Sequence, residues 1–237
     1  MFSGRLVANS QGEIAWNEWL LLPEKIAIHL PTQTALVGDL HLGYYRIRSE
    51  RGDSLPQVTL AEELEPLVRA MKRHGVTNLA CAGDLFEKGG NEDLEWEFQN
   101  GLADNGIRMI AIVPGNHDRK GSWELSCLPW KADGFALGDW WIYHGDKKMP
   151  PRTKEINGHR HPVFALKKGP KHPCFLLSEN RITLPAYSNE VAGVSILKDF
   201  RGPQWKCIAI GKNGCVDLGT MDEVHKLAHP PRPRRSS

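Results

Sequence analysis

The sequence predicts an α/β domain in which strands and helices alternate first and strands alone follow. Short apolar runs rich in β-branched or aromatic residues, bounded by Gly, Pro, Asn or Asp, indicate the strands. Between residues 34 and 113 these runs alternate with two segments of helical spacing, which is typical of βαβ units with right-handed crossovers. After Trp140 short strands succeed one another without a long helix until about residue 190, which predicts a second sheet.

The individual elements follow from this punctuation. Strands are expected at residues 20–22, 27–30, 34–37, 78–82, 109–113, 140–143, 163–166, 174–177 and 182–185. A helix is expected near 58–73, with one apolar face formed by Leu60, Leu64, Leu67, Val68 and Met71. Pro66 lies inside this pattern and predicts a kink or a late helix start. A second helix is expected near 91–104, marked by Leu94, Trp96, Phe98 and Leu102.

Composition limits the class of protein. The 237 residues are 41% hydrophobic, which is enough to build a sizeable core in one domain. The mean hydropathy of −0.41 and the lack of any long apolar run exclude a membrane span, and the N-terminus has no apolar stretch long enough for a secretory signal. The net charge of +2 indicates no particular partner.

The five cysteines bear on the cellular compartment. They are odd in number and include no C-x-x-C pair, which favours reduced thiols over a disulfide framework or a thiolate zinc site. We therefore expect a cytoplasmic protein that does not bind membranes. We expect one domain over residues 1–221 and a flexible basic tail over 222–237 that ends in the sequence HPPRPRRSS.

Polar residues of one chemical kind recur at the ends of the expected strands. Five clusters occur along the chain: Gly38-Asp39-Leu40-His41, Gly83-Asp84, Gly115-Asn116-His117-Asp118, His144-Gly145 and Gly158-His159-Arg160-His161. The first four directly follow apolar strand-like runs, and the loops at the carboxyl ends of strands are where open α/β sheets place their sites. We therefore expect these loops to converge on one point.

The side chains in these clusters suit divalent metals. Carboxylate, amide oxygen and imidazole are ligands for Mn, Fe, Zn, Ni or Co. The D-x-H and H-x-H spacings place both side chains on the same side of an extended segment. A lone Gly-Asp is more often a turn than a ligand, but the five clusters together favour function over coincidence by roughly nineteen to one. Glu87, three residues after Asp84, is a weaker candidate for a residue that supports the ligands.

In this order the clusters resemble the signature of the calcineurin-like metallophosphoesterases, which is D-x-H, GD, GNH[DE], H and GH-x-H. The resemblance covers residues 34–161. Within that superfamily the short chain looks like the small ICC-like and DNA-ligase-associated phosphoesterases. The resemblance implies a four-layer αββα sandwich, with two mixed β-sheets face to face and helices outside.

The resemblance also implies a role for each residue that matches the signature. Asp39, His41 and His161 would bind a first divalent metal, Asn116, His144 and His159 would bind a second, and Asp84 would bridge both. His117 would act on the leaving group, and Asp118 would orient His117 or pair with a nearby base. Asn116 and Arg160 would contact the substrate. Two divalent ions are implied, manganese first and iron, zinc, nickel or magnesium as alternatives.

The expected activity is hydrolysis of phosphate esters, with phosphodiesters preferred and DNA among the expected substrates. Residues 145–172 carry eight positive and two negative charges, which would attract a polyanion such as nucleic acid. An ordinary solvated loop explains the same charges equally well. The alternatives are a hydrolase of small nucleotides or phosphomonoesters and, less favoured because the GNHD cluster is complete, a non-catalytic scaffold. The sequence indicates no protein partner.

Overall fold

The N-terminal half of the chain builds a seven-stranded sheet. A computed structural model describes residues 5–89, 92–118, 123, 126–166 and 169–229. The strands of this sheet lie in chain order, and the first four, together with β5, form an antiparallel meander: β1 (Leu6–Ala8), β2 (Ile14–Trp16), β3 (Trp19–Leu21), β4 (Ala27–His29) and β5 (Thr34–Val37). From β5 onward the pairing is parallel, through β6 (Asn78–Cys81) to β7 (Arg108–Ile112).

The second sheet contains nine strands. Its main path runs β14 (Val194–Ser195), β11 (Pro162–Phe164), β12 (His172–Ser178), β13 (Arg181–Thr183), β10 (Glu155–Asn157), β9 (Trp140–Tyr143) and β8 (Phe135–Leu137). The antiparallel pair β15 (Lys206–Gly211) and β16 (Gly214–Thr220) joins this sheet through β12. Strands β9, β10 and β13 are parallel, so both sheets are mixed.

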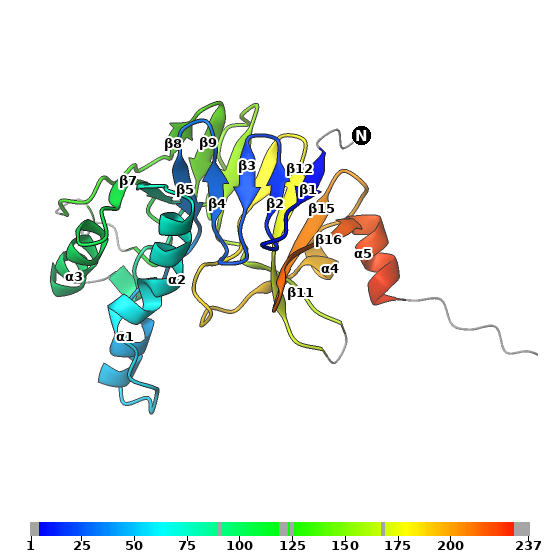
Figure 1. Cartoon of the computed structure of the whole chain (residues 1–237). Coiled ribbons are helices and arrows are strands. Elements are labelled where there is room, and N and C mark those ends of the chain that lie inside the picture. Colours follow the sequence, from blue (N-terminus) through cyan, green and yellow to red (C-terminus); the bar gives the residue numbers. More distant parts are fainter. Residues whose placement is uncertain (1–4, 90–91, 119–122, 124–125, 167–168, 230–237) are drawn as a thin grey trace, which may run out of the picture.

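Three apolar clusters separate four layers. The outer face of the first sheet packs against α2 (Leu60–Arg73) and α3 (Glu92–Ala103). Trp16, Trp19 and Trp140 lie in the cluster between the two sheets. The second sheet packs against the short α4 (Ile196–Asp199) and against α5 (Met221–Ala228). Figure 1 shows α2 and α3 at one side of the molecule and α4 and α5 at the other, which confirms the expected αββα sandwich.

Helix α2 accommodates the proline that the sequence placed inside it. Thr59 caps the helix through a capping box with Glu62, so the helix begins at Leu60. Pro66 removes one backbone donor, and beside it the Tyr187 hydroxyl enters the hydrogen-bond ladder of the helix. This hydroxyl accepts from the Leu67 N–H at 3.2 Å and donates to the Glu63 carbonyl at 3.0 Å. The loop that carries Tyr187 is thereby attached to α2.

The C-terminal boundary differs from the expected one. Residues 221–228 form α5, and Thr220 and Glu223 make a second capping box at its start. Met221 and Val224 are buried against the second sheet. The expectation of a flexible tail from residue 222 is therefore wrong for residues 222–228, because the period of the apolar residues there is helical. Residues 230–237 lie outside the described part of the chain.

Several short elements were not indicated by the sequence pattern. They include β1, β8 and α1 (Tyr44–Glu50), which follows the first polar cluster directly. Helix α1 contains no buried residue, so it lacks the apolar face that identified α2 and α3.

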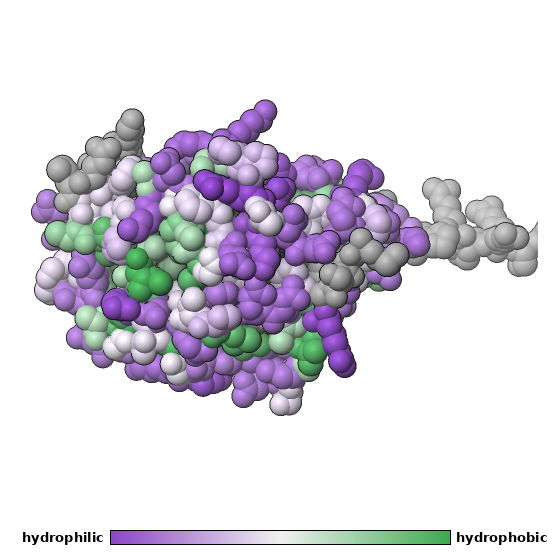
Figure 2. Space-filling view, turned by 90° about the horizontal axis from the view of Figure 1, so that it is seen from above, coloured by the Kyte–Doolittle hydropathy of each residue, from purple (hydrophilic) through white to green (hydrophobic). Residues whose placement is uncertain are grey.

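The surface is polar over most of the face shown in Figure 2, and hydrophobic residues form small patches there. The exposed hydrophobic side chains are spread over different elements, with Trp96 on α3, Val216 on β16 and Leu227 on α5. Among the described residues, the helices are all too short or too polar to span a lipid bilayer.

Candidate metal centre

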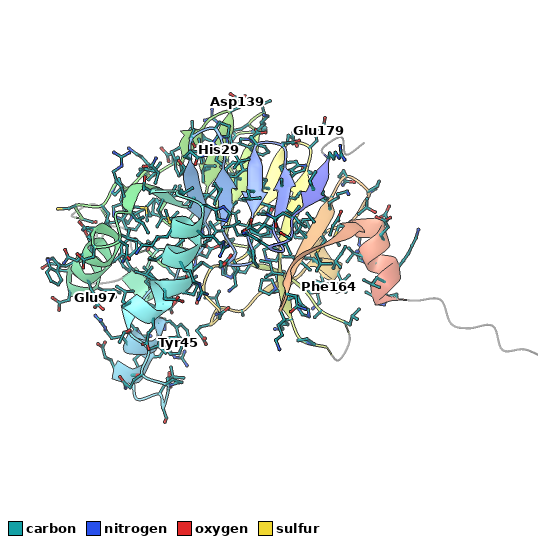
Figure 3. The ribbon with its side chains drawn as sticks, viewed as in Figure 1. His29, Tyr45, Glu97, Asp139, Phe164 and Glu179 are labelled. Carbon is teal, nitrogen blue, oxygen red and sulfur yellow. The ribbon has the colours of Figure 1, made fainter. Side chains whose placement is uncertain are left out.

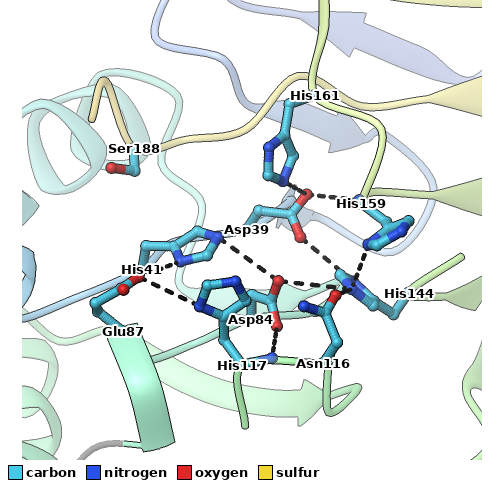
Figure 4. Close-up of polar contacts among 12 residues, drawn as sticks. Asp39, His41, Asp84, Glu87, Asn116, His117, His144, His159, His161 and Ser188 are labelled. Carbon is cyan, nitrogen blue, oxygen red and sulfur yellow. Dashed lines mark hydrogen bonds and ion pairs between the residues drawn. The ribbon is translucent and has the colours of Figure 1, made fainter. Parts of the chain in front are cut away.

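The polar clusters meet where strands of the two sheets end. Asp39 lies two residues after β5, Asp84 three residues after β6, and Asn116 four residues after β7. From the second sheet, His144 follows β9 directly and His159 lies two residues after β10. The expectation that the loops at these strand ends converge is confirmed, since the seven expected metal ligands form one connected group (Figure 4).

Asp39 is the first of two carboxylates around which the group is built. Its Oδ1 lies 3.3 Å from Nδ1 of His144, and its Oδ2 lies 3.3 Å from Nε2 of His161. The same Oδ2 accepts a hydrogen bond from the His159 backbone N–H at 2.8 Å. The side chain is fully buried. Asp39 therefore connects the first sheet to all three histidines that follow β9 and β10.

Asp84 is the second carboxylate and occupies the middle of the group. Its Oδ2 lies 3.6 Å from Nε2 of His41 and 3.6 Å from Nε2 of His144. Its Oδ1 accepts the His117 backbone N–H at 2.7 Å. Nε2 of His144 is also 3.1 Å from Oδ1 of Asn116. Asp84 thus faces imidazoles that come from both sheets.

The backbone at these positions is held in an uncommon conformation. Positive φ angles of 38° to 62° occur at Asp39, His41, Asp84, His159 and His161. Such angles are costly for residues with a Cβ and persist only where the surrounding structure enforces them, typically at functional sites. Here they turn successive side chains of each D-x-H or H-x-H motif into the same space.

Two glycines allow the close approach of the loops. A Cβ on Gly83 would lie 1.8 Å from Nδ1 of His144, and a Cβ on Gly115 would lie 2.1 Å from Oδ1 of Asp84. Gly83 also has a φ of +116°, which side-chain-bearing residues rarely adopt. Glycine is therefore required at both positions if His144 and Asp84 are to keep their places.

The electrostatics of the group favour positive charge between the carboxylates. Burial by itself would raise the pKa of Asp39, but His144 and His161 hold it well below its usual range. Burial would lower the pKa of His144, yet the Asp39 and Asp84 carboxylates raise it to about 9. The two buried carboxylates thus raise the pKa of His144 and His161, and a bound cation would supply the same positive charge.

The donor atoms fit divalent cations. Asp39 Oδ1, His41 Nε2 and His161 Nε2 are buried and have no hydrogen-bond partner among the described residues, although each lies within 3.6 Å of another ligand group. Asp39, His41 and His161 offer donor atoms within 4.8 Å of one another, and so do Asp39, Asp84 and His144. Buried polar atoms without partners are costly, and a metal ion would satisfy them.

Glu87 is more closely involved than the sequence indicated. Its Oε2 accepts from Nδ1 of His41 at 2.9 Å and lies 3.4 Å from Nδ1 of His117. Glu87 is buried and begins the 3₁₀ turn η1 (Glu87–Gly89). The only sequence signal was its spacing from Asp84, because a short turn has no recognisable period.

Asp118 was expected to orient His117 or to pair with a nearby base, and its described hydrogen bonds are to backbone groups instead. Its Oδ2 accepts from the backbone N–H groups of Gly115 and Leu85, and its Oδ1 accepts from Phe86. It forms no ion pair with His117 within the described chain, where Glu87 takes that position. Burial and the Asp84 charge raise the pKa of Asp118 to about 6, against the effect of the backbone donors. Asp118 joins the loop after β6 to the loop after β7.

The positive charge expected of residues 145–172 is partly neutralised by ion pairs. Arg160 forms an ion pair with Asp199 at 3.0 Å and lies over the Phe200 ring, so it points away from the group of ligands. Lys154 pairs with Glu18 and Asp139. Figure 3 shows Asp139 at the upper edge of the molecule, whereas Tyr45 of α1 lies at the lower edge. Lys167 and Lys168 are outside the described residues.

Two clefts flank the loop between β13 and β14. One of about 320 Å³ is lined by His161, Val163, Lys171 and Ser188 among others, so it reaches the group of ligands. The other, about 400 Å³, lies against α1 and α2 and is lined by Tyr44, Glu63 and Tyr187. Lys25, Ser188 and Asn189 line both clefts.

Comparisons with known proteins agree with this geometry. The family model described as calcineurin-like phosphoesterase matches residues 32–232. The crystal structure of the nuclease MPE from Pseudomonas putida is similar, with a TM-score of 0.63 and 18% sequence identity over 91% of this chain and 100% of that chain. At this identity the likeness bears on the fold alone. A search of curated proteins gives no match.

Proposed function

The chain belongs to the calcineurin-like phosphoesterase family, and from this premise we propose that it hydrolyses phosphodiesters with two divalent metal ions. One observation carries the proposal: seven oxygen and nitrogen ligands from both sheets form one group around Asp39 and Asp84, which are two of the seven. Three of their buried donor atoms lack hydrogen-bond partners among the described residues. Burying these atoms without partners costs free energy, and bound metal ions would offset that cost.

We assign the ligands to two sets. Asp39, His41 and His161 would hold one ion, and Asn116, His144 and His159 the other, with Asp84 between them. The 3.6 Å separations from Asp84 to both His41 and His144 support the bridging assignment. Two divalent ions held in this way would lower the pKa of a water molecule and neutralise charge on the phosphoryl oxygens. Manganese is the first candidate for both positions.

His117 is proposed to act on the leaving group. Its backbone is fixed by Asp84, and Glu87 faces its Nδ1, so Nε2 is the atom left to meet the substrate. The Glu87 carboxylate beside Nδ1 would orient the ring, and Nε2 would then give its proton to the departing oxygen. The His117 side chain is 35% exposed, as a group that meets substrate requires.

The substrate-contacting residues are Asn116 and Arg160 in this proposal. Asn116 lies within the ligand group, where its amide reaches a phosphate held there. Arg160 must first leave its ion pair with Asp199, so its contribution depends on the substrate. We further propose a cytoplasmic protein with one domain to Ala228 and a basic tail beyond it.

The proposed physiological substrate is a nucleic acid, DNA first. The sandwich of the Pseudomonas putida nuclease MPE supports this, because a nuclease is built on the same fold. Lys147 lines a pocket together with His144, and Lys171 lines another together with His161, so both can add positive charge near the centre. A small phosphate ester is the second candidate, favoured by the ion pairs that neutralise Lys154 and Arg160 in the basic segment 145–172.

A metal-titrated assay tests the proposal. Metal-free protein is given Mn²⁺ and then bis-p-nitrophenyl phosphate or p-nitrophenyl phosphate. We expect activity that depends on Mn²⁺ and is greater on the diester, and we expect Asp84→Asn to abolish it. Cleavage of linear and nicked DNA by the same preparation would separate the nuclease from a small-molecule diesterase. Activity on neither ester at any metal concentration would leave only the scaffold alternative.

A further inference from the structure

Lys25, which lies outside the polar clusters, is hydrogen-bonded to a loop that contacts two of the proposed ligands. Lys25 lies in the turn between β3 and β4, has a positive φ of 65°, and is only 9% exposed. Burial lowers the pKa of its ammonium group to about 8, against the attraction of Glu190. A buried lysine is uncommon and costs free energy unless its donors are satisfied.

All three donors of Lys25 are directed at one short stretch of chain. The ammonium donates to the Tyr187 carbonyl at 2.7 Å, to Oδ1 of Asn189 at 2.6 Å and to the Ser188 carbonyl at 3.4 Å. An ammonium has three donors, so this one stretch takes the full hydrogen-bonding capacity of Lys25. We name residues 187–192, in the loop between β13 and β14, the strap.

The strap touches two ligands of the same proposed ion. At one end the Ser188 N–H donates to the backbone carbonyl of Asp39 at 3.3 Å, and the Tyr187 N–H donates to Gly38 at 2.7 Å. At the other end the Ala192 carbonyl accepts from Nδ1 of His161 at 3.2 Å. The strap therefore supports the Asp39 backbone and fixes the His161 ring with Nε2 directed at the Asp39 carboxylate.

We propose that Lys25 is a positioning residue for the metal ion held by Asp39, His41 and His161, and that it acts through the strap. The proposal rests on the proposed function, because it requires that ion to bind. His144 and His159 take their places from β9 and β10 without contact to the strap among the described hydrogen bonds. The effect of Lys25 should therefore be larger for the ion held by Asp39, His41 and His161, although Asp39 also contacts His144 and the His159 backbone.

Calorimetric titration of metal-free protein with Mn²⁺ tests this inference. For wild type we expect two bound ions. For Lys25→Met we expect one of the two dissociation constants to rise by about 10- to 100-fold, as for other residues that orient metal ligands, and the other constant to change much less. Asn189→Ala removes one acceptor of the same lysine and should weaken the same ion. In the double variant the two effects should not add.

Lys154→Met is the matched control. Lys154 also pairs through its ammonium group, with Glu18 at 3.2 Å, but it lies away from the strap. The Lys154→Met variant should bind both ions as wild type does. Thermal unfolding of each metal-free variant shows whether the fold is retained. If Lys25→Met does not fold, the metal affinity of Asn189→Ala tests the role of Lys25 instead.

The possible outcomes separate the two proposals. Wild type that binds no Mn²⁺ overturns the proposed function and this inference with it. Wild type that binds two ions while Lys25→Met and Asn189→Ala match it overturns the role of Lys25 alone. Equal weakening of both ions in the folded variants would also overturn it, because that result indicates a general loosening of the fold.

Discussion

His117 differs from the metal ligands at the scale of single residues. About a third of its side chain is exposed, whereas His41 and His144 are buried, and its ring faces Glu87 rather than Asp39 or Asp84. We expect His117→Ala to retain the metal content of wild type and to lose turnover by about 10²- to 10⁴-fold, the usual contribution of a general acid. Metal analysis with kinetics on the diester measures both, and a loss of metal together with activity would make His117 a ligand.

Glu87 supplies the negative charge that this mechanism needs at Nδ1 of His117. Glu87→Gln keeps the size of the side chain but removes the charge beside His41 and His117. We expect turnover to fall by about 10- to 100-fold, because the carboxylate no longer orients the His117 ring.

The control for Glu87 is Glu97→Gln. Glu97 pairs with Arg46 at a half-exposed position, where removing an ion pair has little effect. A Glu87→Gln enzyme with an unchanged rate would show that the carboxylate does not act through His117.

At the scale of elements, the turn after β6 depends on having no side chain at Gly83. Gly83→Ala would place a methyl group against the His144 ring and strain a φ of +116°. We expect loss of one metal ion and a fall in activity of at least about 10²-fold, since a displacement of 1 Å in a site can have that effect. Gly75→Ala is the matched control, because it is strained by a φ of +65° but has open space around it. Full metal content in Gly83→Ala would refute the close packing.

The first turn of α2 contains two glutamates of opposite pH behaviour. Burial raises the pKa of Glu63 from 4.5 to about 7, although the Gly43 N–H opposes the shift. The folded state therefore binds more protons than the unfolded state between pH 4.5 and 7, and stability falls as the pH rises through that window. Because Glu63 is only partly buried, we expect Glu63→Gln to gain only about 1–2 kcal/mol at pH 8, and to equal wild type at pH 4.

Glu62 is the contrasting control for this measurement. Hydrogen bonds from the backbone and side chain of Thr59 lower the pKa of Glu62. Its contribution is therefore present above pH 4.5 and lost as the pH falls through its lowered pKa. Denaturant unfolding at pH 4 and pH 8 should show Glu62→Gln destabilised at pH 8. A Glu63→Gln variant less stable than wild type at pH 8 would contradict the account of Glu63.

The sequence could predict the elements whose apolar residues recur at a regular spacing or whose ends are marked by turn residues. Helix α3 matches its expectation to within a residue or so, because its buried Leu94, Phe98 and Leu102 recur at helical spacing. The convergence of the ligands could be predicted because each cluster follows a strand. The strap could not be predicted, since Lys25 and Tyr187 are 162 residues apart and neither lies in a motif. The sequence could not show that Glu87 faces His117, because only the folded turns decide which carboxylate lies beside it.

At the scale of the whole molecule, the centre lies between the two halves of the sandwich. Asp39, His41, Asp84 and Asn116 follow strands of the first sheet, and His144, His159 and His161 follow strands of the second. Asp39 and Asp84 each contact imidazoles from the second sheet across the interface. The two sheets must therefore keep this relative position for either ion to be bound.

The most direct measurement is an anomalous difference map from a crystal grown with Mn²⁺. The account predicts two peaks about 3.5–4 Å apart, one beside Asp39, His41 and His161 and the other beside Asn116, His144 and His159, with Asp84 between them. A map with no peak among these residues, or with one peak bound by Glu87 and His117 instead, would contradict it.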